Sequence, residues 1–221
     1  MDSTEKKIKV ALVDDHVLLR NALSSLINNF ENCRVIFQSS NGKELISQVK
    51  TGEKPDVILL DLNMPEMDGY ETASYLRDHH SDIHILMLTM YDSELALIRL
   101  LQAGVKGFLK KDIHPSELKF AIQSVMQSGY YYSNHTTGKL INLFRNKNDN
   151  NMLLQKTMLS EQELDFLKLV CTDMTYKEIA QQMKLNPRSV DNLRDHLFTK
   201  LDLKSRVGLA MYSIKHGIVT F

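Results

Sequence analysis

The sequence has few cysteines, no excess of charge of either sign and no long apolar run. Its 221 residues contain two cysteines, Cys33 and Cys171, which are far apart and lack metal-ligand spacing. We therefore expect two inert thiols in a reducing compartment. No apolar stretch is long enough to cross a bilayer, and the N-terminus lacks the apolar core of a signal peptide. These absences favour a cytoplasmic protein without a membrane partner.

The charge balance gives only a weak indication of nucleic-acid binding. Lysine and arginine number 27, as do aspartate and glutamate, so the formal net charge is zero. Acidic residues are in excess over residues 1–128, whereas the remainder of the chain is mildly basic. A typical DNA-binding domain is more basic than this. The length suggests one or two domains of ordinary globular composition.

Residues 1–128 alternate strand-like and helix-like segments. The predicted strands are 9–13, 34–38, 57–60, 83–88 and 107–109. Amphipathic helices are predicted at 17–29, 41–50, 69–79, 93–103 and 115–127. Five strands interleaved with five helices predict an α/β fold, a five-stranded doubly wound parallel sheet covered on both faces. Three of the strands read as near-continuous apolar runs, as expected for strands covered on both faces.

The composition changes beyond residue 128. Residues 129–155 are rich in Asn, Ser, Thr and Gly and predict a linker with one short helix, although a surface insertion within a single domain is an alternative. Residues 156–221 are helical in pattern. Ser160 and Glu163 form a capping-box pair, and Asn186 precedes Pro187 as an N-cap. We expect a small all-α domain of four helices.

Carboxylates gather where predicted strands end. Asp14 and Asp15 follow the first strand, and Asp61 follows the third. The carboxyl ends of parallel strands meet at one edge of a sheet, where ligands bind. Three carboxylates in a small cavity repel one another, and Mg²⁺ would relieve that repulsion while leaving coordination positions open for a phosphate. Thr89 and a lysine of the segment GFLKKD end two further strands.

This arrangement favours phosphoryl transfer to a carboxylate nucleophile. Each residue taken alone has an ordinary explanation: Asp14 and Asp15 as a helix N-cap pair, Asp61 as a turn residue, and the lysine as a solvated charge. Five suitable groups at the strand ends of one sheet make those separate explanations improbable together.

The segments VDDH, ILLDLNMPEMDG and AGVKGFLKKD resemble the receiver domain of two-component response regulators, which has a flavodoxin-like fold. The C-terminal segment resembles a LuxR-type helix-turn-helix, so the whole chain resembles the NarL/FixJ class of transcription regulators. The resemblance implies a receiver at 1–128 and a DNA-binding domain at 156–221. It further implies phosphorylation by a sensor histidine kinase, homodimerisation on activation and binding to double-stranded DNA.

The resemblance also implies roles for individual pocket residues. Asp61 would accept the phosphoryl group. Asp15, Asp61 and the backbone carbonyl of Asn63 would bind Mg²⁺, with Asp14 acting through water. Beyond self-phosphorylation and slow self-dephosphorylation, no enzymatic activity is expected. Tyr91 stands where family members tune that hydrolysis, and its bulk predicts a long-lived phosphoryl group.

Two further strand-end residues and one aromatic complete the expected receiver site. Thr89 and Lys111 would contact the phosphoryl group, and Phe108 would be the aromatic switch that follows Thr89. Lys111 lies three positions after Phe108, as in the family. Lys110 is the rival lysine, but strand alternation would direct it to the other face.

The helix-turn-helix pattern predicts DNA contacts. The second helix would enter the major groove, and the predicted base-reading residues are Arg188, Ser189, Asn192 and Arg194. The predicted phosphate contacts are Lys177, Lys200, Lys204 and Arg206. Asp191 replaces a lysine usual in the family. It could pair with Arg188 or Arg194, or accept a hydrogen bond from cytosine N4.

Two other functions fit parts of the sequence. A Mg²⁺-dependent phosphatase would use an aspartyl nucleophile, but such enzymes often carry a second aspartate where this chain has Asn63. A constitutive DNA-binding protein would have a purely structural acid pocket. In the last predicted helix an apolar stripe, part of which could form a dimer seam, consists of Val207, Ala210, Met211 and Ile214.

Overall fold

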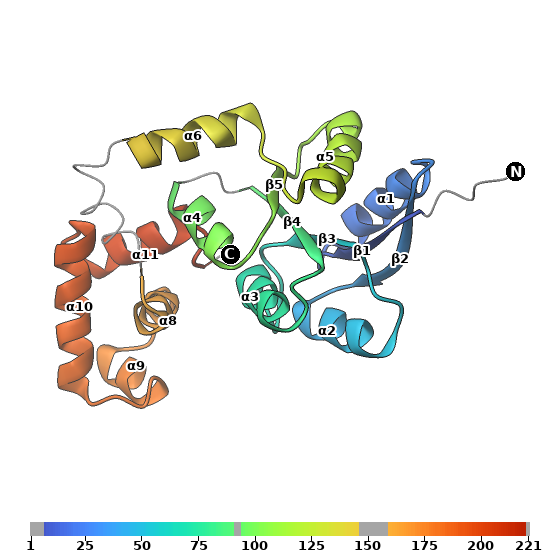
Figure 1. The fold of residues 1–221 in the computed structure, drawn as a ribbon. Helices are drawn as coiled ribbons and strands as arrows, with labels where there is room; N and C mark the ends of the chain where they lie inside the picture. Colours follow the sequence, from blue (N-terminus) through green and yellow to red (C-terminus); the bar gives the residue numbers. More distant parts are fainter. Residues whose placement is uncertain (1–6, 91–93, 146–158, 220–221) are drawn as a thin grey trace, which may run out of the picture. The chain divides into compact units, whose positions relative to one another are not determined.

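The computed structural model describes residues 7–90, 94–145 and 159–219. The chain forms two compact units, one containing a sheet with its covering helices and the other containing the C-terminal helices (Figure 1). Tyr91 and the part of the expected linker from residue 146 to 155 lie outside the described residues.

The first unit is built on a parallel sheet of five strands in the order β2-β1-β3-β4-β5. The strands are β1 (Ile8–Val13), β2 (Cys33–Ser39), β3 (Val57–Asp61), β4 (His84–Thr89) and β5 (Gly107–Lys110). The predicted α/β fold is therefore confirmed. The three inner strands, β1, β3 and β4, consist almost entirely of buried residues, as expected for strands covered on both sides.

Helices cover both faces of this sheet (Figure 1). They are α1 (Val17–Asn28), α2 (Gly42–Thr51), α3 (Gly69–His79), α4 (Glu94–Gln102) and α5 (Pro115–Ser128). Alternate strand residues such as Val10 and Leu59 pack with Ile27 of α1 and Ile122 of α5 in one apolar core. Because side chains alternate across a strand, the intervening residues face the opposite layer.

Local signals set where these helices begin. The Asn41 side chain accepts a hydrogen bond from the backbone N–H of Glu44 at 2.9 Å and caps α2. Pro115 occupies the first turn of α5, where a missing N–H costs nothing. Both helices begin within one residue of their predicted starts at 41 and 115.

The chain stays attached to the sheet after α5 ends. Gly129, with φ of 83°, adopts a left-handed conformation at the end of that helix. The backbone N–H of Tyr131 then donates to the Lys106 carbonyl at 2.8 Å, and Tyr131 forms a parallel bridge with Gly107 at the sheet edge. Helix α6 (Asn134–Arg145) follows. The start of the polar segment is therefore an edge element of the sheet.

Residues 159–219 of the second unit form four helices: α8 (Glu161–Val170), α9 (Tyr176–Gln182), α10 (Pro187–Leu201) and α11 (Arg206–Lys215). Ser160 and Glu163 form the expected capping box, and the Asn186 side chain caps α10. The core of this unit includes the fully buried Phe166, Ile179 and Val190. Within the described ranges, no helix combines the length and apolarity that crossing a bilayer requires.

Candidate functional site

Three carboxylates meet at the carboxyl edge of the sheet. Asp14 follows β1 directly and Asp61 is the last residue of β3; their exposed fractions are 2% and 1%. Asp15 lies beside them and is exposed. The potential ligand atoms of Asp14, Asp15, His16 and Asp61 all lie within 4.8 Å of one another. The sequence predicted that the three aspartates lie together. It did not identify His16 as a member of this cluster, although the position of His16 directly after Asp15 indicated it.

The structure distinguishes the two candidate lysines. The Lys111 Nζ atom lies 2.9 Å from Asp61 Oδ2 and 3.1 Å from Asp14 Oδ2. Burial alone would lower the pKa of this ammonium group, but Asp61 and Asp14 outweigh that effect and raise it. Lys110 ends β5 and instead lines a neighbouring cavity. Lys111, the lysine favoured by its spacing from Phe108, is therefore the one that lies beside Asp61.

Burial dominates the electrostatics of Asp61. It raises the pKa of that carboxyl group to about 6, although Lys111 acts in the opposite direction and the charge of Asp14 adds to the rise. The backbone N–H of Leu62 donates to Asp61 Oδ1 at 2.7 Å and holds the carboxylate in place. A buried carboxylate with a raised pKa and one nearby ammonium group still carries an uncompensated electrostatic cost.

The donor set fits a hard divalent cation. Asp14, Asp15 and Asp61 offer carboxylate oxygens, which are the ligands that Mg²⁺ prefers, and Asp15 keeps the pocket open to water. A cation here would relieve the repulsion between Asp14 and Asp61. His16 contacts both neighbouring acids, with Nδ1 3.1 Å from Asp14 Oδ1 and 2.9 Å from Asp15 Oδ1.

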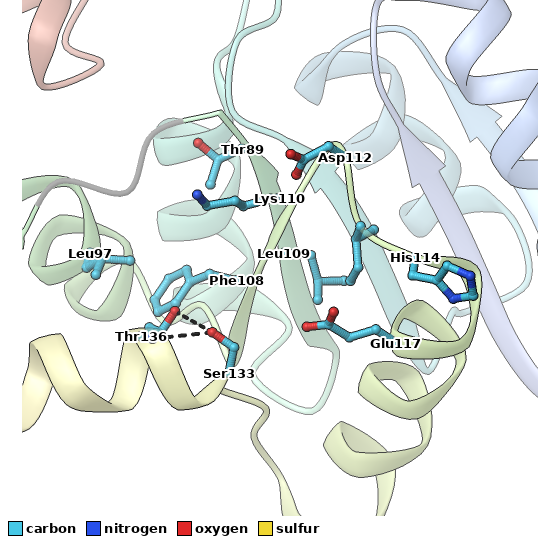
Figure 2. A pocket seen from close by; sticks show the side chains of 11 residues that line it. Thr89, Leu97, Phe108, Leu109, Lys110, Asp112, His114, Glu117, Ser133 and Thr136 are labelled. Atoms are coloured by element: carbon cyan, nitrogen blue, oxygen red, sulfur yellow. Dashed lines mark hydrogen bonds between the residues drawn. The ribbon is translucent and has the colours of Figure 1, made fainter.

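A cavity of about 340 Å³ adjoins the end of β4 (Figure 2). Thr89, the last residue of β4, and Phe108 of β5 both line it, and both are nearly buried. The Phe108 ring lies 5.5 Å from the ring of Tyr132, centroid to centroid. Ser133 and Thr136, at the start of α6, close the same cavity and are hydrogen-bonded to each other at 3.1 Å. Thr89 and Phe108 therefore share one space with the segment that follows α5.

Helices α9 and α10 form the helix-turn-helix of the second unit. They pack through Ile179, Ala180 and Val190, which are buried. Four of the predicted DNA contacts are exposed: Lys177, Arg188, Asn192 and Lys204. Ser189 is partly buried, and its backbone N–H donates to Asn186 Oδ1 at 2.7 Å.

Two other predicted phosphate contacts have partners within the protein. Lys200 Nζ lies 2.8 Å from both carboxylate oxygens of Glu163, which is buried. Burial would raise the pKa of Glu163, but Lys200 and the Ser160 backbone outweigh it and lower the pKa. Arg206 donates to the backbone carbonyls of Val170 at 3.1 Å and Thr172 at 2.7 Å. Both cations hold α8 in place, which gives them a structural role that the sequence did not reveal.

Arg194, predicted to read bases, is also engaged. Its guanidinium lies 2.9 Å from Asp191 Oδ1 and 2.9 Å from Asp195 Oδ1. The guanidinium carbon lies 5.1 Å from the centre of the Tyr176 ring. The expected pairing of Asp191 with Arg194 is present.

A buried acid pocket with a strand-end lysine on a five-stranded parallel sheet, followed by a helix-turn-helix, defines the receiver-and-output architecture of a response regulator. Residues 10–123 match the response regulator receiver domain family, and residues 157–213 match the LuxR family of bacterial regulatory proteins. The chain therefore belongs to the response regulators of the NarL/FixJ class.

Individual relatives agree with this assignment. The chain is 31% identical over 219 residues to the oxygen regulatory protein NreC of Staphylococcus epidermidis, covering 97% of this chain and 100% of that protein. The receiver domain of NarL from Mycobacterium tuberculosis is 28% identical, with a TM-score of 0.53 and coverage of 56% and 98%. RcsB from Salmonella enterica serovar Typhimurium, solved bound to promoter rprA with the phosphomimetic BeF3-, shares the fold at 20% identity, with a TM-score of 0.69 and coverage of 94% and 98%.

Proposed function

We propose that Asp61 accepts a phosphoryl group from a sensor histidine kinase and that this modification controls DNA binding. The observation that carries the proposal is the contact of Lys111 with Asp61 and Asp14 inside the acid cluster. In the transfer, the bond between phosphorus and the donor histidine nitrogen breaks. A bond from phosphorus to an Asp61 oxygen forms, and the freed histidine takes up a proton.

The residues around Asp61 have separate roles in this step. Asp15, Asp61 and the Asn63 backbone carbonyl would hold Mg²⁺, with Asp14 acting through water. Bound Mg²⁺ neutralises phosphoryl oxygens. Lys111 exchanges its ion pair with Asp61 for one with the new phosphate, so its charge stays compensated before and after transfer. The receiver domain is proposed to transfer the group only to itself and to hydrolyse it slowly.

Thr89 and Phe108 are the proposed switch residues. The Thr89 hydroxyl would bind the phosphoryl group, and Phe108 would change its packing as Thr89 moves. The shared cavity supports this because it provides space next to both side chains. Tyr132 packs against the Phe108 ring, and the start of α6 lines the cavity, so the change would reach the segment that leads toward the DNA-binding domain.

The proposed DNA-binding domain spans residues 156–221 and inserts α10 into the major groove. Its proposed contacts are the side chains that remain available on the surface: Lys177, Arg188, Ser189, Asn192 and Lys204. We further propose a homodimer on activation. Val207 and Met211, on one face of α11, are 71% and 60% exposed, and this apolar surface would pair with its copy around a two-fold axis.

Phosphate incorporation tests the receiver part of the proposal. The full chain is incubated with acetyl phosphate, with and without Mg²⁺, and intact mass is measured for wild type and Asp61→Asn. We expect Mg²⁺-dependent labelling of wild type only. Lys110→Ala serves as the matched control, since that lysine lies outside the ion-pair cluster, and it should label normally. Labelling of Asp61→Asn at the wild-type level would contradict the assignment.

We further propose that the protein acts in the cytoplasm, where a DNA-binding regulator would meet its promoter. Turnover of small phosphoesters would instead favour a phosphatase. Equal DNA affinity in wild type and Asp61→Asn, without phosphate uptake, would favour a constitutive DNA-binding protein.

A further inference from the structure

The recognition helix α10 carries an acidic side chain near its N-terminus. Asp191 is the fifth residue of α10, in the region from which such helices contact base edges. Its side chain is 51% exposed, whereas the preceding Val190 is fully buried. The carboxylate therefore lies on the outer surface of the helix. An acid so close to DNA phosphates weakens binding to every sequence unless it makes a specific contact.

Arg194 holds this carboxylate in a defined position. Its Nη1 atom lies 2.9 Å from Asp191 Oδ1, one turn along the helix. The other edge of the guanidinium faces Asp195, and the Tyr176 ring packs near its carbon. Arg194 is only 24% exposed. The N–H donors of Arg194 are directed at the carboxylates of Asp191 and Asp195. Arg194 therefore holds the Asp191 side chain in place and offsets part of the negative charge of Asp191.

We propose that Asp191 reads cytosine in the major groove and that Arg194 is its positioning residue. An ionised carboxylate only accepts hydrogen bonds and can accept several, so the bond from Arg194 leaves acceptor capacity for a base. Cytosine presents an amino donor in the major groove and no acceptor of its own. Adenine presents N7 beside its amino group, and guanine and thymine present acceptors that repel a carboxylate. This inference rests on the proposed DNA binding and adds its base preference.

Selection from a randomised double-stranded DNA library tests the inference. The full chain is activated with beryllofluoride and Mg²⁺, and wild type is compared with Asp191→Ala and Asp191→Asn. We expect wild type to select cytosine at one position of each half-site, with about tenfold discrimination against other bases there. Asp191→Ala should lose that preference while keeping the other positions. Asp191→Asn should shift it toward adenine, because an amide matches both adenine groups.

Two controls separate base reading from charge and folding. Asp165→Ala removes one exposed acid from α8 and should leave the selected sequence unchanged. Arg194→Met should reduce the preference for cytosine more than it reduces the overall affinity for DNA. Arg194→Lys should keep more of the cytosine preference than Arg194→Met does. The inference is overturned if Asp191→Ala selects the same sequence as wild type, or binds all sequences more tightly by one common factor. If activated wild type enriches no sequence, the proposed DNA-binding function fails, and the inference with it.

Discussion

Replacing Asp61 with asparagine should stabilise the protein when no divalent cation is present. Burial raises the pKa of Asp61 to about 6, an effect that Lys111 opposes and Asp14 reinforces. The rise in pKa from the ordinary value of 3.8 corresponds to about 3 kcal/mol. The folded protein loses this amount of stability when the buried carboxyl group ionises. Asparagine has nearly the same shape and no charge, so Asp61→Asn should recover about that amount at neutral pH.

The gain should depend on pH in a defined direction. The folded-state pKa lies above the unfolded one, so wild type loses stability as pH rises from 3.8 through about 6. Asp61→Asn lacks this loss. The difference in free energy of unfolding between the two proteins should be near zero at pH 3.8, increase as the pH rises to about 6, and stay constant at higher pH. Urea denaturation followed by circular dichroism, in EDTA at several pH values, measures the difference.

Asp15→Asn is the matched control, because it makes the same chemical change at an exposed position in the same cluster. Its stability in EDTA should stay within about 0.5 kcal/mol of wild type. Adding Mg²⁺ should narrow the gap between wild type and Asp61→Asn, since an ion that binds the folded form stabilises it. The reasoning is refuted if Asp61→Asn in EDTA at neutral pH is no more stable than wild type.

Three further perturbations test other parts of the account. Lys200→Ala should lower the free energy of unfolding by about 3 kcal/mol, because it removes the ammonium group that pairs with the buried Glu163 carboxylate; an unchanged urea midpoint would rule out that structural role. Lys111→Ala should reduce labelling by acetyl phosphate at least tenfold, whereas Lys110→Ala should not; equal rates in the two variants would show that the ion-paired lysine is not the phosphate contact. Tyr91→Glu should shorten the lifetime of the phosphoryl group, measured as decay of the labelled mass, and an unchanged lifetime would contradict the long-lived phosphoryl group predicted from the bulk of Tyr91.

The sheet and the acid pocket could be predicted because their signals are local. Apolar runs marked the strands, and residues such as Asn41 and Pro115 marked where helices begin. Since parallel strands end at one edge, the position of Asp61 at the end of β3 was enough to bring it near Asp14. The prediction of Lys111 followed from its position three residues after Phe108, as in the receiver family.

The partners of two predicted phosphate contacts, Lys200 and Arg206, show where local reasoning fails. Lys200 looked like a surface lysine, but its partner Glu163 lies 37 residues away and is buried only because the helices pack together. The attachment of Tyr131 to the sheet edge likewise depends on contacts that the local sequence does not indicate. Its backbone bond to Lys106 and its hydroxyl bond to Glu117 at 2.8 Å depend on chain reversal after α5. Neither contact follows from the composition of the segment.

The affinity of the full chain for one promoter fragment, measured with and without beryllofluoride and Mg²⁺, tests the central claim most directly. A fragment chosen by selection would be titrated with wild type and Asp61→Asn. If Asp61 is the phosphoacceptor that controls DNA binding, beryllofluoride should tighten binding by wild type and leave Asp61→Asn unchanged. Equal affinities of wild type in both conditions would contradict control of DNA binding through Asp61.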